Sequence, residues 1–110
     1  MDWLIGHLVG DYLLQNDWMA VNKKYRTLPC LVHVSLYTAA VGLFTWWPWW
    51  ALIVVAVTHF IQDRTRIVLL WMRFMRQEGF AQPPYAPWSV IVVDNVWHLV
   101  VLYMLDRLVA

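Results

Sequence analysis

The chain has 110 residues, which is enough for one domain, and its single cysteine cannot form an internal disulfide. Hydrophobic residues make up 62% of the chain and charged residues 14%, whereas soluble domains average about 45–50% and about 25%. This composition places the chain in the membrane class, and a net charge of +1 gives no reason to expect nucleic acid as a partner.

Four apolar segments follow one another, and each is long enough for a membrane-spanning helix, which needs about 20 residues. Residues 3–20 form the first segment and residues 28–47 the second. A tight aromatic turn with a proline, which interrupts a continuing helix, leads to the third at residues 49–70. A longer, proline-containing connection leads to the fourth at residues 88–109. We therefore expect an all-α fold, with residues 1–110 forming one integral membrane bundle of four transmembrane helices.

The basic residues predict how this bundle is oriented. Seven of the eight lie in the first connection or around the end of the third segment, and a bundle of alternating helices places both regions on one side. The positive-inside rule makes that side cytoplasmic. We therefore expect a multi-pass protein of a cytoplasmic membrane, with both termini outside and membrane lipids around it.

Every histidine lies in an apolar segment, and three of the four stand four residues from an aspartate. Residues four apart share one face of a helix, so each His/Asp pair would point in one direction. Counted at about 1.5 Å per residue, helices that run in opposite directions bring these groups to similar depths. Ionisable residues inside a membrane are costly, which makes them a functional-site hypothesis. The candidate site residues are His7, Asp11, His33, His59, Asp63, Asp94 and His98.

Two glycines, Gly6 and Gly10, stand four residues apart beside the first His/Asp pair. Small residues at this spacing let a neighbouring helix approach closely. We therefore expect a second helix to pack against this face of the first segment.

Three interpretations of the seven residues remain open. Imidazole and carboxylate are ligands of zinc, iron or manganese, so the first interpretation is a centre for a divalent metal ion. Seven groups exceed what one tetrahedral ion needs, and the surplus could hold a second ion, act as a general base or orient ligands. The second interpretation is that the histidines are structural and form hydrogen bonds with their aspartates or with another helix, since buried ionisable groups usually have partners. The third is a proton relay, because His and Asp are the usual relay members in membranes.

The motifs that carry these residues resemble a known family. The run from His7 to Ala20, followed by Asn22-Lys23-Lys24, is similar to the opening of the domain-of-unknown-function family numbered 3307. His33 with Tyr37, the run His59–Asp63 and the run Asp94–His98 resemble its later motifs in the same order. This resemblance implies a small multi-pass membrane protein of bacteria or their phages, and implies no established activity. A looser likeness, in residue type and membrane location, is to inner-membrane metal-dependent hydrolases.

The leading hypothesis is a metal centre in a bacterial inner-membrane protein, which hydrolyses a lipid or another membrane-accessible substrate. Asp11, His59 and His98 would be the inner ligands. Asp63, Asp94 and His33 would complete the site, with His7 peripheral. The alternative is a non-enzymatic membrane subunit or small transport component whose His/Asp pairs are structural or carry protons. Besides lipids, a second copy of the chain or another membrane protein is the expected partner.

Overall fold

The computed structural model describes residues 2–109, and every regular element within them is helical. The elements are α1 (Asp2–Leu8), a π-helical turn η1 (Val9–Leu13), α2 (Asp17–Asn22), α3 (Thr27–Thr45), α4 (Trp49–Arg64), α5 (Ile67–Phe74) and α6 (Trp88–Val109). The expected all-α fold is confirmed. By length and composition, α3 and α6 are the two described helices that could cross a membrane. The bundle of four spans stays a prediction.

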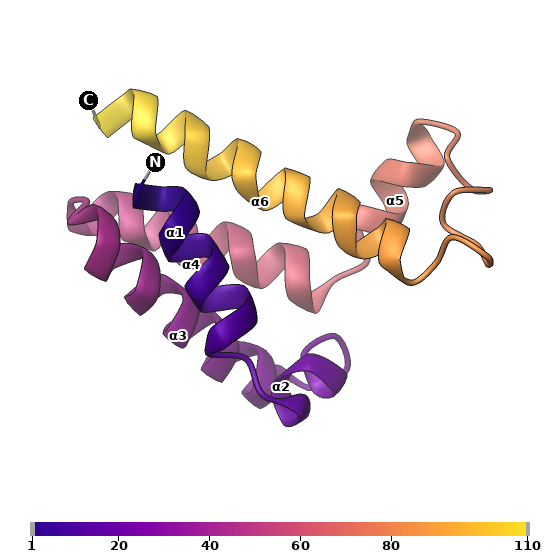
Figure 1. The fold of residues 1–110 in the computed structure, drawn as a ribbon, viewed down its shortest axis with the longest axis horizontal. Helices are drawn as coiled ribbons and strands as arrows, with labels where there is room; N and C mark the ends of the chain where they lie inside the picture. The colour runs from indigo at the N-terminus through magenta and orange to yellow at the C-terminus, as the bar shows by residue number, and fades with distance from the viewer. Residues whose placement is uncertain (1, 110) are drawn as a thin grey trace.

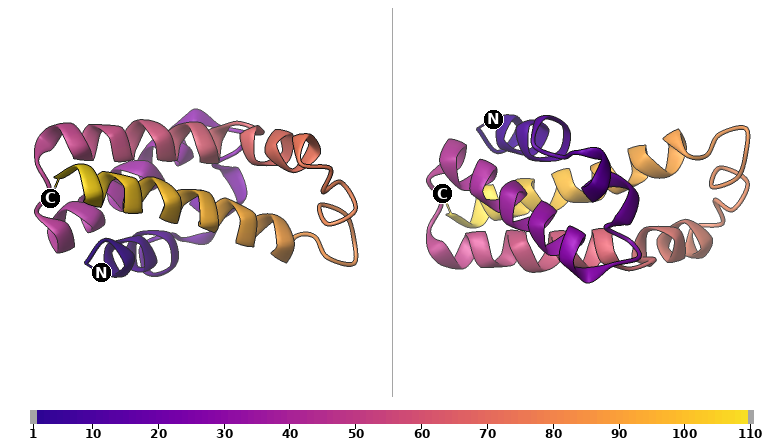
Figure 2. Two further views of the ribbon diagram at one scale, coloured as in Figure 1. Left: turned by 90° about the horizontal axis from the view of Figure 1, so that it is seen from above. Right: turned by 90° about the horizontal axis from the view of Figure 1, so that it is seen from below.

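The long helices and α1 form the body of the molecule (Figure 1). α1 packs on α3 and α6, α3 packs on α4, and α4 packs on α6. The start of α1, the end of α6 and the turn between α3 and α4 lie at one end, and α5 lies at the other (Figure 2). Polar residues from the middle of these elements can therefore meet inside the bundle.

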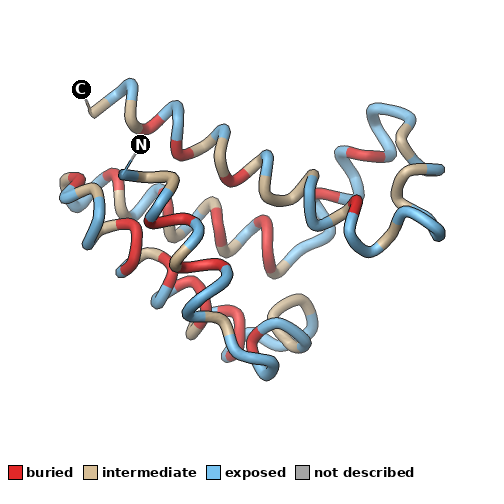
Figure 3. Tube along the Cα trace, viewed as in Figure 1, coloured by how far each residue is buried: buried red, intermediate tan, exposed pale blue. Residues whose placement is uncertain are grey.

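Buried residues form one stripe along each long helix (Figure 3). In α4 they recur every four residues, at Ala51, Val55 and His59, which is the spacing of one helical face. At the end that holds the α3–α4 turn, the stripes meet in an apolar cluster, which consists of Tyr37, Val41, Trp47, Ala51, Val55, Leu102 and Leu105. The histidines follow directly on the same stripes, so the helices that form this cluster also position the candidate site.

Two glycines, Gly6 of α1 and Gly10 of η1, bring these elements into direct contact with α3. A Cβ atom added to Gly6 would lie 2.8 Å from the Cα atom of Val41, and one added to Gly10 would lie 2.7 Å from Cδ2 of Tyr37. Neither position has room for a side chain. The close approach expected from the sequence is confirmed, and it places the end of α1 and η1 against α3.

The expected helix over residues 3–20 is not continuous. α1 passes into η1, which ends at Leu13, and α2 begins at Asp17. The side chain of Asn16 accepts a hydrogen bond of 3.0 Å from the backbone N–H of Met19 and thereby caps α2. Asparagine favours such a new helix start over a helix interior, because its side chain competes for backbone hydrogen bonds.

The expected helix over residues 49–70 is also divided, into α4 and α5. The chain is extended at Thr65, where ψ is 176°. Lys24 Nζ donates to the carbonyl oxygens of Gln62 and Asp63, at 3.1 Å each, and to that of Thr65 at 3.3 Å. The lysine thus satisfies carbonyls at the end of α4 that a continuing helix would pair with its own N–H groups.

Candidate metal centre

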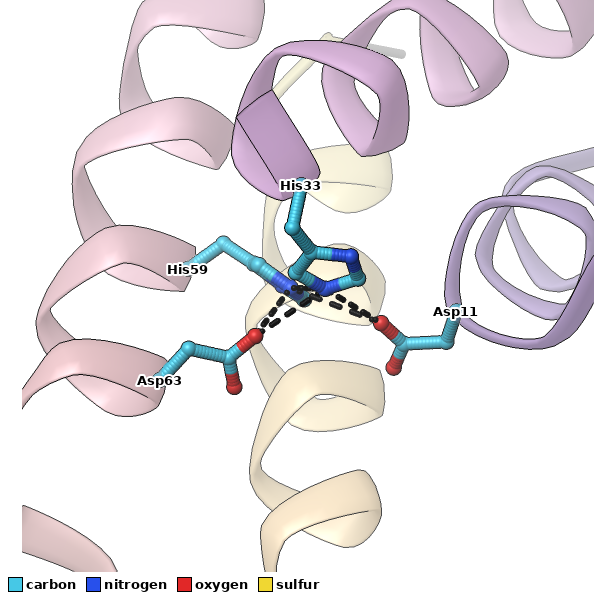
Figure 4. A group of neighbouring side chains, drawn as sticks. All are labelled: Asp11, His33, His59 and Asp63. Atoms are coloured by element: carbon cyan, nitrogen blue, oxygen red, sulfur yellow. Dashed lines mark hydrogen bonds and ion pairs between the residues drawn. The ribbon is translucent and has the colours of Figure 1, made fainter. Parts of the chain in front are cut away.

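Four buried side chains from three elements meet inside the bundle (Figure 4). Asp11 comes from η1, His33 from α3, and His59 and Asp63 from successive turns of α4. His33 Nε2 lies 3.1 Å from Asp11 Oδ1 and 3.0 Å from Asp63 Oδ2. His59 Nε2 lies 3.5 Å and 2.9 Å from the same two oxygens, and 3.0 Å from His33 Nε2. The four side chains each offer one ligand atom, and these atoms all lie within 4.8 Å of one another.

These separations are suitable for the ligands of one ion. Donors placed about 2.0–2.2 Å from a tetrahedral zinc ion are about 3.3–3.6 Å from one another. Adjacent donors around an octahedral ion with similar bond lengths are about 3.0 Å apart. The five separations given above, 2.9–3.5 Å, cover both cases. The group could therefore hold a divalent metal ion.

The carboxylate oxygens of this group lack hydrogen bonds of normal geometry. Asp11 Oδ1 and both oxygens of Asp63 are buried and have no hydrogen bond of normal geometry within residues 2–109, although Lys23 Nζ forms an ion pair of 3.2 Å with Asp63 Oδ2. Their short distances to the imidazoles are therefore not those of well-aligned N–H donors. Buried carboxylates without hydrogen bonds are costly, and a bound cation would offset that cost. The donor atoms thus fit a metal ion better than they fit direct His-to-Asp hydrogen bonds.

Asp63 also takes part in a second group, with Asp94 and His98 of α6. His98 Nε2 lies 3.4 Å from Asp63 Oδ1 and 3.2 Å from Asp94 Oδ2. One oxygen of Asp63 therefore faces His33 and His59, and the other faces His98. Asp63 joins the two groups.

His7 is the one predicted residue that lies outside both groups. Its Nε2 is 2.8 Å from Asn95 Oδ1, which can only accept, so Nε2 carries the proton. The neutral ring then accepts at Nδ1 from the hydroxyl of Tyr37, 2.7 Å away. Both nitrogens of His7 are paired, while its Nε2 is 3.7 Å from Asp11 Oδ2. The ring borders the centre and leaves no lone pair for an ion.

Aromatic stacking positions two of the imidazoles, those of His59 and His98. The ring of Tyr37 stacks on His59, with centroids 3.8 Å apart, and His59 stacks on His98 at 4.1 Å. The tyrosine therefore orients His59 by its ring and His7 by its hydroxyl. Tyr37 was not among the candidate site residues, although its position four residues after His33 places it on the same helical face.

A cavity of about 420 Å³ opens onto the two groups. Asp11, Asp63 and Asp94 lie on its wall. The rest of the wall is partly basic, with Lys23, Lys24 and Arg66, and partly apolar, with Val21, Val68, Leu69, Val90 and Ile91. Arg66 and Ile91 are also exposed, so the cavity reaches the molecular surface.

The contact of Lys23 with Asp63 was not predicted, because Lys23 was expected in a connection outside the membrane. Its Nζ lies 3.2 Å from Asp63 Oδ2 and donates to Gln15 Oε1 at 3.0 Å. Asn95, the partner of His7, was missed as well, although it directly follows Asp94. Its place next to Asp94 in the sequence was the signal that could have identified Asn95.

The order of these motifs agrees with one family over the whole chain. The family described as "Protein of unknown function (DUF3307)" matches residues 1–110. The chain belongs to this family. No curated protein and no solved structure matches it. The resemblance to DUF3307 seen in the sequence is confirmed, and the looser likeness to metal-dependent hydrolases stays a prediction.

Proposed function

We propose that this DUF3307 protein is an integral membrane protein with a divalent metal centre at Asp11, His33, His59 and Asp63, and that it hydrolyses a lipid or another membrane-accessible substrate. The observation that carries the proposal is the convergence of four buried donor atoms within 4.8 Å. Zinc, iron and manganese all suit this set of imidazole and carboxylate donors. These residues would hold an ion that, when bound, would supply a nucleophile at neutral pH by lowering the pKa of water.

The outer faces of the helices support the membrane location. Ile53 and Val57 of α4 are about half exposed, as are Val96 and Tyr103 of α6, and Leu43 of α3 is 65% exposed. Soluble monomers rarely expose contiguous apolar surfaces of this kind. In a bilayer, the same side chains would face hydrocarbon, and the buried stripes would hold the polar groups.

The cavity supports an amphiphilic substrate with an anionic head group. Val68, Leu69 and Ile91 offer an apolar wall for an acyl chain. Arg66 and Lys23 offer cations for a phosphate or carboxylate near the three aspartates. Pockets that bind small molecules commonly combine apolar walls with a few placed polar groups in this way.

A proton relay across the bundle is less well supported. The stripes that carry His33, His59 and His98 turn apolar in the direction of the α3–α4 turn, at Val41, Val55 and Leu102. A relay needs a chain of groups that both donate and accept, and among the described residues the apolar cluster offers only the hydroxyl of Tyr37, since the indole of Trp47 donates but does not accept.

The proposed hydrolysis can be tested with detergent-purified protein and mixed micelles of anionic, zwitterionic and uncharged lipids. We expect wild type loaded with zinc or manganese to release a product detectable by mass spectrometry from an anionic lipid. Asp63→Asn and excess chelator should abolish release, and Asp106→Asn, far along α6, should leave it unchanged. Equal release by Asp63→Asn, or no product from any lipid class, would overturn the hydrolase assignment.

A further inference from the structure

We infer that the centre is dinuclear, with a second divalent ion held by Asp63 Oδ1, Asp94 and His98 and bridged to the first through the Asp63 carboxylate. This inference rests on the proposed function, because the bridge requires the first ion. It adds a second metal site, to which Asp63 and Asp94 contribute from the wall of the cavity.

Two of the three donors of this second site are buried, and each of the three residues has an unpaired side-chain atom. His98 is 3% exposed and Asp63 is 1% exposed. His98 Nε2, Asp63 Oδ1 and Asp94 Oδ1 have no hydrogen-bond partner within the described part of the chain. His98 Nε2 nevertheless lies 3.4 Å from Asp63 Oδ1 and 3.2 Å from Asp94 Oδ2. A buried imidazole between two carboxylates, without an aligned hydrogen bond to either, is a suitable ligand for a cation.

The two sites are arranged as in carboxylate-bridged pairs. Asp63 presents Oδ2 to the first site and Oδ1 to the second, at 2.9 Å from His59 Nε2 and 3.4 Å from His98 Nε2. The rings of His59 and His98 stack 4.1 Å apart, which keeps these two donors side by side. Ions in two-metal enzymes lie about 3.5–4 Å apart, a span that one carboxylate can bridge.

The second site is the more open of the two. The first has four protein donors, whereas the second has three, and the side chain of Asp94 is 19% exposed on the cavity wall. An ion with four protein donors keeps a position for water only when its coordination number exceeds four, whereas an ion with three keeps more room for water or substrate. The second ion is therefore the one that would contact a substrate in the cavity.

The charges of the centre predict the order of binding. Asp11, Asp63 and Asp94 with Lys23 carry a formal charge of −2, so one divalent ion neutralises the site. A second ion leaves a positive charge, which opposes its binding until an anion enters the cavity. We therefore expect the second ion to bind at least tenfold more weakly than the first, and to bind more tightly when inorganic phosphate is present, since such coupling is reciprocal.

Manganese titration of metal-free, detergent-purified protein tests the inference. We expect two ions per chain by equilibrium dialysis, and the six-line electron paramagnetic resonance spectrum of the first ion should broaden when the second couples to it. Inorganic phosphate should lower the concentration at which the second ion binds. His98→Gln and Asp94→Asn should each bind one ion with an uncoupled spectrum. Circular dichroism of both variants checks that the helices are retained.

The outcomes separate this inference from the proposed function. Saturation of wild type at one ion that both variants retain would overturn the second site and leave the first intact. Two coupled ions in both variants would overturn the assignment to Asp94 and His98. A folded wild type that binds no manganese, zinc or iron would overturn the proposed metal centre itself.

Discussion

His33 Nε2 lies 3.0 Å from His59 Nε2, although the two residues come from different helices and are fully buried. Two imidazole lone pairs repel at this distance, so a proton or a cation must lie between them. Carboxylate oxygens of Asp11 and Asp63 approach the same pair of nitrogens. Two carboxylates beside two imidazoles form a set of donors that suits a divalent cation.

Close packing of η1 on α3 should be required for the centre, because η1 carries Asp11. In Gly10→Ala the new Cβ would lie 2.7 Å from Cδ2 and 3.0 Å from Cα of Tyr37. We expect a loss of about 1–3 kcal/mol in stability, as overpacked cores show, together with weaker metal binding. Thermal unfolding in detergent and a zinc titration measure the two effects. Gly79→Ala, where the added Cβ meets nothing within 4 Å, is the matched control, and equal behaviour of the two variants would count against this packing.

The ring and the hydroxyl of Tyr37 should make separable contributions. Tyr37→Phe keeps the stack on His59 and removes the hydrogen bond to His7, so we expect it to lose about 1 kcal/mol of stability and to keep its metal. Tyr37→Leu removes both contacts and should weaken metal binding as well. A zinc titration of the two variants distinguishes them. Identical affinities would show that the stack does not orient His59.

Lys23 should compete with a metal ion for Asp63, since its ammonium lies 3.2 Å from Oδ2. Two unit charges about 4 Å apart interact by about 4 kcal/mol at an effective dielectric constant of 20. Removing the lysine charge in Lys23→Met should therefore tighten metal binding by about tenfold or more. Arg73→Met removes an exposed charge as a control. Unchanged or weaker metal binding in Lys23→Met would contradict this competition, and weaker binding would mean that the lysine stabilises the metal-bound site.

The exposed apolar faces should lie in the bilayer. Val57, near the middle of α4, is 52% exposed. A lysine at such a depth costs about 2.5–3.5 kcal/mol in membrane insertion, whereas on a water-exposed surface it is nearly neutral. We expect Val57→Lys to reduce the membrane-integrated fraction after alkaline extraction, and Glu78→Lys in the α5–α6 connection to leave it unchanged. Full extraction of wild type at alkaline pH would contradict the membrane location.

Much of the site could be predicted from the sequence, because it depends on helical periodicity. Asp63 follows His59 by four residues and Asp94 precedes His98 by four, and in both cases the two side chains lie on one buried face. Counting residues along oppositely directed helices also brought His33 close to them. Such regular geometry requires only the rise and turn of an α-helix.

The remaining features depend on interactions between distant residues, which periodicity does not encode. The end of α4 is determined by Lys24, about 40 positions earlier in the chain, and the pairing of His7 depends on Asn95. The first segment also departs from a regular helix at η1, which carries Asp11. A π-helical turn shifts the following side chains around the helix axis, so a count of 3.6 residues per turn misplaces them.

Elemental analysis of detergent-purified wild type, His59→Gln and His7→Gln tests the metal centre most directly. We expect near-stoichiometric zinc, iron or manganese in wild type, loss of that metal in His59→Gln, and retention in His7→Gln, since both ring nitrogens of His7 are already paired. Folded, helical wild type without metal after purification in the absence of chelators, or the same metal content in His59→Gln as in wild type, would contradict the proposed metal centre.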